Sequence, residues 1–327
     1  MELVATSTGA IDLQINGALG VNFNNLHGEN YQQIPKILRW LWQNGVDAFL
    51  PTLVTTSIAN YRRSLFYWRE FIGKPMPNSA VAIGLHLEGP FLNPAKRGAH
   101  PQTYLLPLDI DHIQLVLGAH TDLVKMITLA PELDTTGSGI PYLRQLGITV
   151  SLGHSLADQA TTQRAIAQGA ELVTHTFNAM PALQHRQVNL LTEALLNERL
   201  YCGVIADGHH VHPRMLELLY RLKGDKLFLV SDALAPLGLA DGVYTWDDRK
   251  ITVQAGTARL PDGTLAGTTL PLWQQVENLV KWGICDLPRA IATVTTVPSQ
   301  ILGLSLPNTL SWYLLPDGHY QRERLAV

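Results

Sequence analysis

The sequence predicts an α/β fold in which eight parallel strands, each followed by a helix, close into a (β/α)8 barrel of the TIM type. Eight short runs rich in β-branched and large apolar residues recur between residues 10 and 232. Most of these runs lack strict alternation of polar and apolar residues, as expected for strands buried on both faces of a parallel sheet. Segments of helical length separate the runs, which is typical of βαβ units. An open doubly wound sheet is the alternative that this pattern also allows.

The elements follow one another in regular order. The predicted strands are 10–16, 46–52, 81–88, 123–130, 148–154, 171–176, 201–207 and 226–232. The helical segments between them include 31–44, 57–72, 107–119, 155–169 and 212–224. In the segment 155–169, Ser155 followed by Asp158 resembles a capping box and Gly169 ends the pattern. We therefore expect this helix to leave directly from His154 at the end of the fifth strand.

The chain after the eighth strand predicts further β structure. Residues 242–263 contain strand-like runs and a Pro-Asp-Gly turn at 261–263, which indicates a β excursion from the barrel. Helices then resume at about 269–283 and 287–302, and the tail predicts one or two short strands around Asp317-Gly318. We predict a barrel domain over 1–303 and a C-terminal β tail over 304–327 that is the remnant of a small β domain.

Composition excludes several classes of protein. With 46% hydrophobic and 16% charged residues, the 327-residue chain can bury a sizeable core. A net charge of −3 without a run of Lys or Arg argues against nucleic acid as a partner. Cys202 and Cys285 are too few and too far apart for a disulfide framework or a cysteine zinc site. No signal-peptide pattern or 18-residue apolar stretch is present, so we expect a cytoplasmic protein without membrane association.

Polar residues that can bind a metal end four of the predicted strands: Glu88, His154, His175 and Asp232. Each alone has a commonplace explanation, since a strand-end carboxylate is more often a helix cap and a strand-end histidine is as often a wall residue. In a barrel, however, these strand ends meet at one mouth. Two histidines and one glutamate supply three ligands for a catalytic metal and leave a position open for water. Asp232 would then serve as general base, with a fourth ligand or a cap as its alternative roles.

Two other groups of histidines are assigned different roles. His86 shares the inward face with Glu88 but lies one layer deeper, where a structural or supporting role is more common than metal ligation. The polar cluster 207–212 follows the seventh strand and contains His209, His210 and His212. We expect at least one imidazole of this cluster to contact substrate.

Seven segments in order resemble the N-acetylglucosamine-6-phosphate deacetylase family of the amidohydrolase superfamily. The resemblance covers about residues 11–302, and seven ordered matches rarely arise by chance. The matching segments are IDLQING (11–17), HLEGPFLNPAKRGAHP (86–101), SLGHS (151–155), THTFNAMP (174–181), IADGHH (205–210), SDALAP (231–236) and GTLAGT (263–268).

The resemblance implies a role for each matching residue. It makes Glu88, His154 and His175 the metal ligands and Asp232 the catalytic acid and base. It also implies that His100 contacts the acetamido sugar and polarises the scissile carbonyl, and that Arg186 binds phosphate. The remaining substrate contacts that it implies are Ala99, Asn178, Ala179, Asp207, His210, Leu265, Ala266 and Gly267.

The first strand bears on the number of metal ions. Many amidohydrolases carry His-x-His here, whereas this chain carries Gln14 and Asn16, whose neutral amides are poor ligands for transition metals. We therefore expect one divalent metal ion per active site, with zinc favoured and iron or manganese suited to the same ligands. The first barrel strand begins near residue 11, so we expect the family's small β-sandwich to be reduced or missing. The resemblance further implies a homodimer.

Three functions remain open from the sequence. The first is deacetylation of N-acetylglucosamine 6-phosphate to glucosamine 6-phosphate and acetate. The second is deacetylation of a related N-acetyl sugar phosphate, for example N-acetylgalactosamine 6-phosphate. The third is a relative that binds an amino-sugar phosphate without catalysis.

Overall fold

Eight parallel strands form the centre of the molecule in the computed structural model, which describes residues 1–316 and 320–325. Their order in the sheet follows the chain, and a parallel bridge between Ile15 and Ala233 joins the last strand to the first. This closure confirms the predicted (β/α)8 barrel, so the open sheet is excluded. The strands are β2 (Ala10–Ile15), β5 (Val46–Val54), β7 (Leu85–Glu88), β8 (Val124–Leu129), β9 (Thr149–Leu152), β10 (Ala170–Val173), β11 (Tyr201–Val204) and β12 (Leu227–Leu229).

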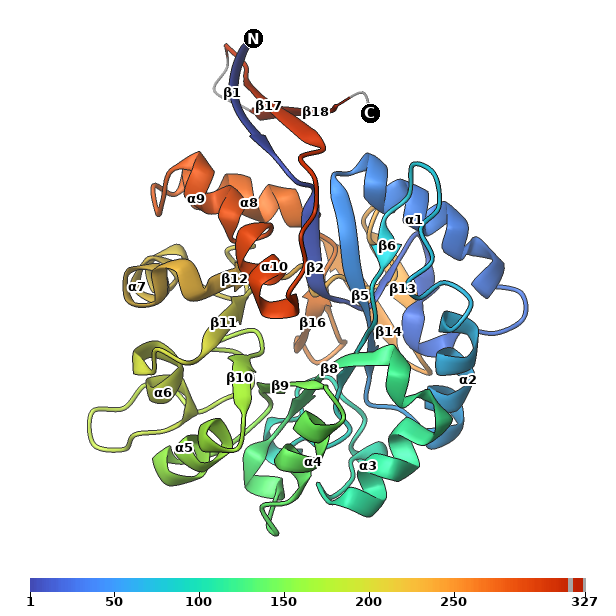
Figure 1. Cartoon of the computed structure of the whole chain (residues 1–327), viewed down its shortest axis with the longest axis vertical. Helices are drawn as coiled ribbons and strands as arrows, with labels where there is room; N and C mark the ends of the chain where they lie inside the picture. Colours follow the sequence, from blue (N-terminus) through green and yellow to red (C-terminus); the bar gives the residue numbers. More distant parts are fainter. Residues whose placement is uncertain (317–319, 326–327) are drawn as a thin grey trace.

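Helices surround the strands (Figure 1). In α1, residues spaced by three and four positions, Ile34, Ile37, Leu38 and Leu41, form the buried face. The helices are α1 (Ile34–Gln43), α2 (Ile58–Trp68), α3 (Ile110–Leu117), α4 (Gly139–Gln145), α5 (Gln159–Ala167), α6 (Leu190–Leu196), α7 (Pro213–Lys223), α8 (Leu272–Lys281), α9 (Leu287–Ala292) and α10 (Thr296–Leu302).

Two helix predictions are wrong in detail. Helix α5 begins at Gln159 rather than residue 155, because Asp158 is its N-cap and accepts a hydrogen bond from the backbone N–H of Thr161 at 2.8 Å. The Ser155 hydroxyl instead donates to the Glu132 carboxylate at 2.7 Å, so no capping box forms. The predicted helix 287–302 is two helices, α9 and α10, with a break at residues 293–295.

The predicted third strand, 81–88, is divided into β6 (Val81–Ala82) and β7. At the break, Gly84 has φ +158°, and a Cβ there would lie 2.1 Å from Cγ of Lys125. The strand bounds also correct the placement of three polar residues. His154, His175 and Asp232 lie in the loops that follow β9, β10 and β12, whereas Glu88 is the last residue of β7.

The predicted β excursion is a four-stranded antiparallel sheet that continues five residues beyond the expected end at 263. It consists of β13 (Gly242–Thr245), β14 (Lys250–Gln254), β15 (Thr257–Arg259) and β16 (Leu265–Thr268). The predicted turn at 261–263 connects β15 to β16, and Thr268 forms a parallel bridge with Ala233. The excursion therefore returns to the barrel beside Asp232.

A separate three-stranded sheet consists of β1 (Glu2–Ser7), β17 (Leu310–Leu314) and β18 (Tyr320–Arg324), with β17 in the middle. Figure 1 shows this sheet projecting beyond the helices. Trp312 anchors it, because its indole N–H donates to the Ser7 hydroxyl at 3.0 Å and its ring lies 4.7 Å from that of Trp273. The predicted strands around Asp317-Gly318 correspond to β17 and β18, but these two residues lie outside the described part of the chain. The domain boundary at 303/304 stays a prediction.

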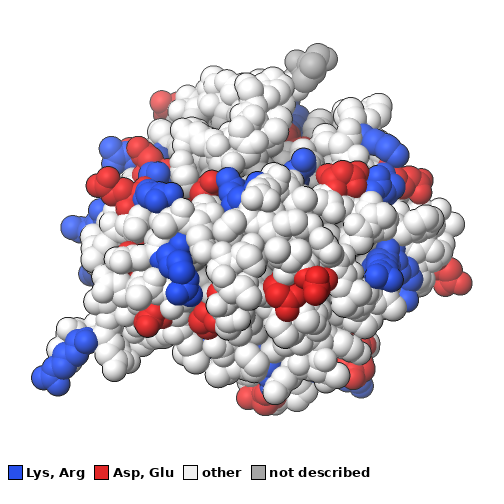
Figure 2. All heavy atoms as spheres, turned by 60° about the horizontal axis from the view of Figure 1, so that its bottom comes forward, with Lys and Arg blue, Asp and Glu red and all other residues white. Residues whose placement is uncertain are grey.

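Charges of both signs are interspersed on the face shown in Figure 2, without a large patch of a single sign. Among residues 1–316 and 320–325, none of the helices combines the length and the apolar character needed to cross a bilayer.

Candidate active site

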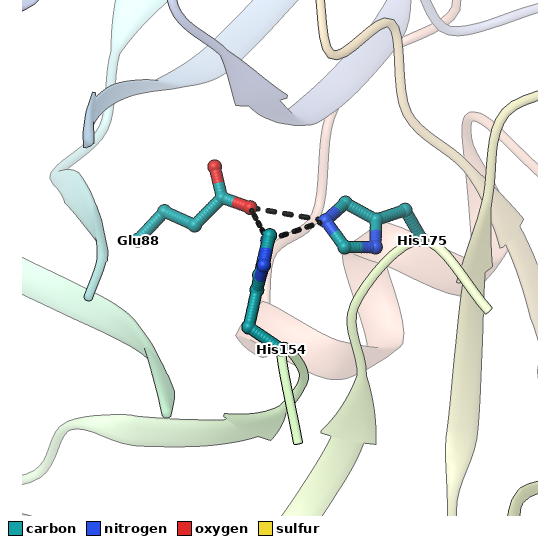
Figure 3. A group of neighbouring side chains, drawn as sticks. All are labelled: Glu88, His154 and His175. Carbon is teal, nitrogen blue, oxygen red and sulfur yellow. Dashed lines mark hydrogen bonds and ion pairs between the residues drawn. The ribbon is translucent and has the colours of Figure 1, made fainter. Parts of the chain in front are cut away.

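Three buried side chains meet at the barrel mouth (Figure 3). Oε1 of Glu88 lies 3.1 Å from Nε2 of His154 and 3.1 Å from Nε2 of His175, and the two Nε2 atoms are 3.0 Å apart. Glu88 arrives on β7, whereas the histidines come from the loops after β9 and β10. One carboxylate oxygen and two imidazole nitrogens, all within 4.8 Å of one another, could hold a metal ion.

The surroundings of His154 prepare it for metal ligation. Its Nδ1–H donates to the backbone carbonyl of Lys96 at 2.8 Å, so the lone pair of the neutral ring is on Nε2, toward Glu88. Burial, together with the neighbouring His100, lowers the pKa of His154 to about 4, which favours the neutral ring. Burial opposes ionisation of Glu88, but contacts with three histidines hold the pKa of its carboxyl well below the usual value. The donor set thus fits a divalent transition metal.

Backbone strain is concentrated in the same residues. His154, His175 and Asp232 have φ angles of +49°, +28° and +45°, and all are non-glycine residues. Left-handed conformations of this kind cost energy and persist where the surrounding structure enforces them, often at functional sites. The three loops therefore turn sharply at the residues whose side chains enter the mouth.

Asp232 is held by the two amides of the first strand. Its Oδ1 accepts hydrogen bonds from Asn16 Nδ2 at 2.7 Å and Gln14 Nε2 at 3.2 Å. Burial and the nearby Glu88 charge raise the pKa of Asp232 to about 7, which suits a group that takes up and releases protons near neutrality. Gln14 and Asn16 thus contact the carboxylate through their donor groups, as positioning residues.

The proton position on His100 follows from its neighbours. The backbone N–H of Thr55, which can only donate, points to His100 Nδ1 at 3.4 Å, and the Thr55 hydroxyl lies 2.9 Å from the same nitrogen. The neutral ring therefore carries its proton on Nε2, 3.8 Å from Glu88 Oε1. This N–H is available to an oxygen atom bound in the cavity.

Asp207 supports His210 rather than lining the cavity itself. Its carboxylate accepts from the His210 backbone N–H at 2.8 Å and contacts the imidazole Nδ1 at 2.6 Å. Burial raises the pKa of Asp207, but the hydrogen bond and charge of His210 outweigh this effect and lower it. The pair thereby fixes the His210 ring in the cavity wall.

A cavity of about 340 Å³ joins these groups. Gly267 fits only as glycine there, because its φ is +142° and a Cβ would lie 2.7 Å from the carbonyl oxygen of Asp232. Asn178 donates through Nδ2 to the backbone carbonyl of His175 at 3.3 Å. The predicted site residues that line the cavity are Asn16, Glu88, Ala99, His100, His154, His175, Asn178, Ala179, His210, Asp232, Leu265, Ala266 and Gly267.

Besides Asp207, one other predicted substrate residue is absent from the cavity lining. Arg186 lies in the exposed loop 182–188 and is absent from the cavity lining. Conversely, Val54, Lys96, Leu234 and Trp246 line the cavity although the sequence did not identify them. Leu234 is close to Asp232 in the sequence and could have been found from that motif, but Trp246 enters from the β excursion and carries no local signal.

A family model for the amidohydrolase family matches residues 8–306. The chain belongs to the amidohydrolase family. Amidohydrolases are metal-dependent hydrolases, and the buried Glu88, His154 and His175 are the group that could bind the metal.

Curated members of this amidohydrolase family carry a common name. The chain is 38% identical over 304 residues to N-acetylglucosamine-6-phosphate deacetylase of Bos taurus, covering 90% of this chain and 74% of the relative. It is 33% identical over 281 residues to the Bacillus subtilis (strain 168) protein of the same name, covering 85% and 70%.

Solved structures of amidohydrolases with that name share the fold. The Pasteurella multocida deacetylase has a TM-score of 0.85 and 29% identity, covering 96% of this chain and 83% of the other. A mutant of the Mycobacterium smegmatis enzyme, solved in complex with N-acetyl-D-glucosamine-6-phosphate, has a TM-score of 0.85 and 27% identity, covering 98% and 85%.

Proposed function

We propose that this amidohydrolase removes the acetyl group from N-acetylglucosamine 6-phosphate, releasing acetate and glucosamine 6-phosphate. The observation that carries the proposal is the convergence of Glu88, His154, His175 and Asp232 on one cavity. The substrate is inferred from relatives at 30–38% identity that bear this name and from a similar structure in complex with the sugar phosphate.

We propose that Glu88, His154 and His175 hold one divalent ion, with zinc favoured and iron or manganese compatible with the same ligands. When bound, such an ion supplies Lewis acidity, which polarises a carbonyl group and makes water a stronger acid. The amides of Gln14 and Asn16 donate to Asp232, which supports a single ion rather than two.

Asp232 is proposed to move the proton. Its carboxylate takes a proton from the attacking water while the water oxygen bonds to the acetyl carbon, and it returns that proton to the nitrogen as the C–N bond breaks. The Nε2–H of His100 donates to the carbonyl oxygen, where negative charge develops. The second proton of the water stays on the carboxyl group that forms, so the immediate products are acetic acid and the amine, and one proton then passes between them to give acetate and the ammonium group.

The sugar is proposed to lie against Asn178, Ala179, His210 and the segment 265–267. Asp207 holds His210 in place for this contact. Arg186 is proposed to bind the phosphate, although its loop lies outside the cavity lining. This role requires loop 182–188 to fold inward or the same loop of a second copy to reach across, which fits the proposed homodimer. A cytoplasmic location is proposed on the basis of the substrate.

The test is acetate release from N-acetylglucosamine 6-phosphate by protein loaded with zinc. We expect Asp232→Asn to lose about 10²- to 10⁴-fold in kcat while retaining the metal, since an asparagine Oδ1 can still accept from Gln14 and Asn16. No acetate release by the wild type contradicts the proposal, and near-normal turnover by the variant removes Asp232 from the mechanism. Preferred turnover of N-acetylgalactosamine 6-phosphate would instead favour the second substrate.

A further inference from the structure

Two cavities lie on either side of one shared wall at the barrel mouth. The active-site cavity has a volume of about 340 Å³, and a second one, of about 380 Å³, lies next to it. Val54 and Trp246 line both of them. Most of the other residues that line the second cavity are polar, including Asn24, Thr56 and Asn60. Because the indole of Trp246 is by far the larger of the two shared side chains, it forms most of the partition.

Trp246 is clamped in this position. It lies in the loop between β13 and β14, and its backbone carbonyl accepts from Asn22 Nδ2 at 2.8 Å. The guanidinium of Arg249 lies 4.8 Å from the indole ring centre, and its Nη1 donates to the carbonyl of Ala99 at 2.8 Å. Only 7% of Trp246 is exposed, and these contacts hold it in place.

The wall formed by Trp246 and Val54 lies next to the catalytic residues, together with other apolar side chains. Val54 pairs in register with Glu88, Ala99 precedes His100, and Leu234 follows Asp232 by two positions. Val54, Ala99 and Leu234 belong with Trp246 to one buried apolar cluster. The methyl group of an acetamide next to the catalytic groups would therefore lie against this cluster, while the sugar faces the polar part of the cavity.

We propose that Trp246 sets acyl-chain specificity: its indole admits an acetyl group and excludes longer acyl groups from the active site. This inference rests on the proposed function and specifies which part of the cavity receives the acyl group. The reaction is the same for every acyl group, since the water oxygen bonds to the acyl carbon, the C–N bond breaks, one water proton passes to the nitrogen, and a carboxylic acid and an amine result. Removal of the indole would join the two cavities and give room for a longer chain.

The experiment compares kcat/KM for the N-acetyl, N-propionyl and N-butyryl derivatives of glucosamine 6-phosphate, using the zinc-loaded full chain. For Trp246→Ala, we expect the ratio of butyryl to acetyl activity to rise at least ~10-fold over wild type, the lower end of the effect of one methylene in an apolar pocket. Trp246→Phe should show a smaller rise. Phe66→Ala, an exposed aromatic residue on α2, should leave the ratio unchanged.

The outcomes separate this inference from the proposed function. If wild type releases acetate and Trp246→Ala lowers activity on all three compounds equally, Trp246 has only a structural role and the inference is overturned. If Trp246→Ala does not fold, Val54→Ala decides, because it shortens a side chain of the same wall and should also raise the ratio of butyryl to acetyl activity. An unchanged ratio in that variant also overturns the inference. A wild type that is inactive on all three derivatives refutes both proposals.

Discussion

Asp12 imposes a pH-dependent cost on folding that Asp12→Asn should remove. The side chain lies on β2 and is 1% exposed, and its Oδ1 accepts from the backbone N–H groups of Gln14 and Ser231, each at 3.2 Å. Burial raises the pKa of Asp12 from 3.8 to about 6, against the opposing effect of these hydrogen bonds. Asparagine can accept the same two hydrogen bonds without carrying a charge.

The size and sign of the effect follow from linkage. A folded-state pKa above the unfolded value gives a stabilisation that is complete below the unfolded pKa and is lost as the pH rises through the folded pKa. The shift of Asp12 from 3.8 to about 6 corresponds to about 3 kcal/mol. Because pH 4 lies just above the unfolded pKa, the free energy of unfolding of Asp12→Asn relative to wild type should rise by about 2.4 kcal/mol between pH 4 and pH 7.

Urea unfolding followed by tryptophan fluorescence, with a chelator present and at constant ionic strength, measures this difference at each pH. Asp158→Asn is a control of opposite sign, because the hydrogen bond from the Thr161 backbone lowers the pKa of Asp158. Its contribution to stability is lost as the pH falls, and asparagine remains a good N-cap. A difference between Asp12→Asn and wild type that is flat across this range would refute the reasoning.

Three further outcomes are expected. Zinc at 100 times its Kd should raise the unfolding free energy by about 2.7 kcal/mol. Thermal melts with and without zinc measure this gain, and Glu88→Gln should lose most of it. Gly267→Ala should destabilise the protein more than Gly263→Ala, because a Cβ at position 263 has open space around it. The expected difference is on the order of 1 to 3 kcal/mol, as for overpacking, and equal unfolding midpoints in urea would contradict it. Arg324→Ala removes the ion pair with Asp47 and should lower the unfolding free energy by about 2 kcal/mol. Adding Asp47→Asn to this variant should not double the loss, because both substitutions remove the same ion pair.

The barrel could be predicted because each strand is marked locally by a short apolar run and segments of helical length separate the runs. The details that failed depend on contacts between distant segments. Ser155 and Asp158 are both good N-cap residues, and the choice between them is made by Glu132, which accepts from the Ser155 hydroxyl. Strand β1 carries several exposed residues and no buried run, and its partner β17 is far along the chain.

The candidate site likewise contains residues that the sequence could predict and residues that it could not. Glu88, His154, His175 and Asp232 are each close to the end of a barrel strand, so the topology alone brings them together. Trp246 reaches the cavity through the β excursion, and nothing in the local sequence indicates which way that sheet folds. For Arg186 the sequence motif suggests a role, but the loop 182–188 is exposed and its side chains have no fixed place in the cavity.

The sheet that joins the two ends of the described chain has a consequence for synthesis. Ser7 and Trp312, which share a hydrogen bond, are 305 positions apart. On the ribosome, β1 emerges before the barrel, but its partner strand β17 follows only when residues 310–314 have left the exit tunnel. The barrel strands pair with near neighbours and can begin to assemble on the nascent chain, whereas the β1–β17 ladder must be among the last contacts to form, because it closes the longest loop.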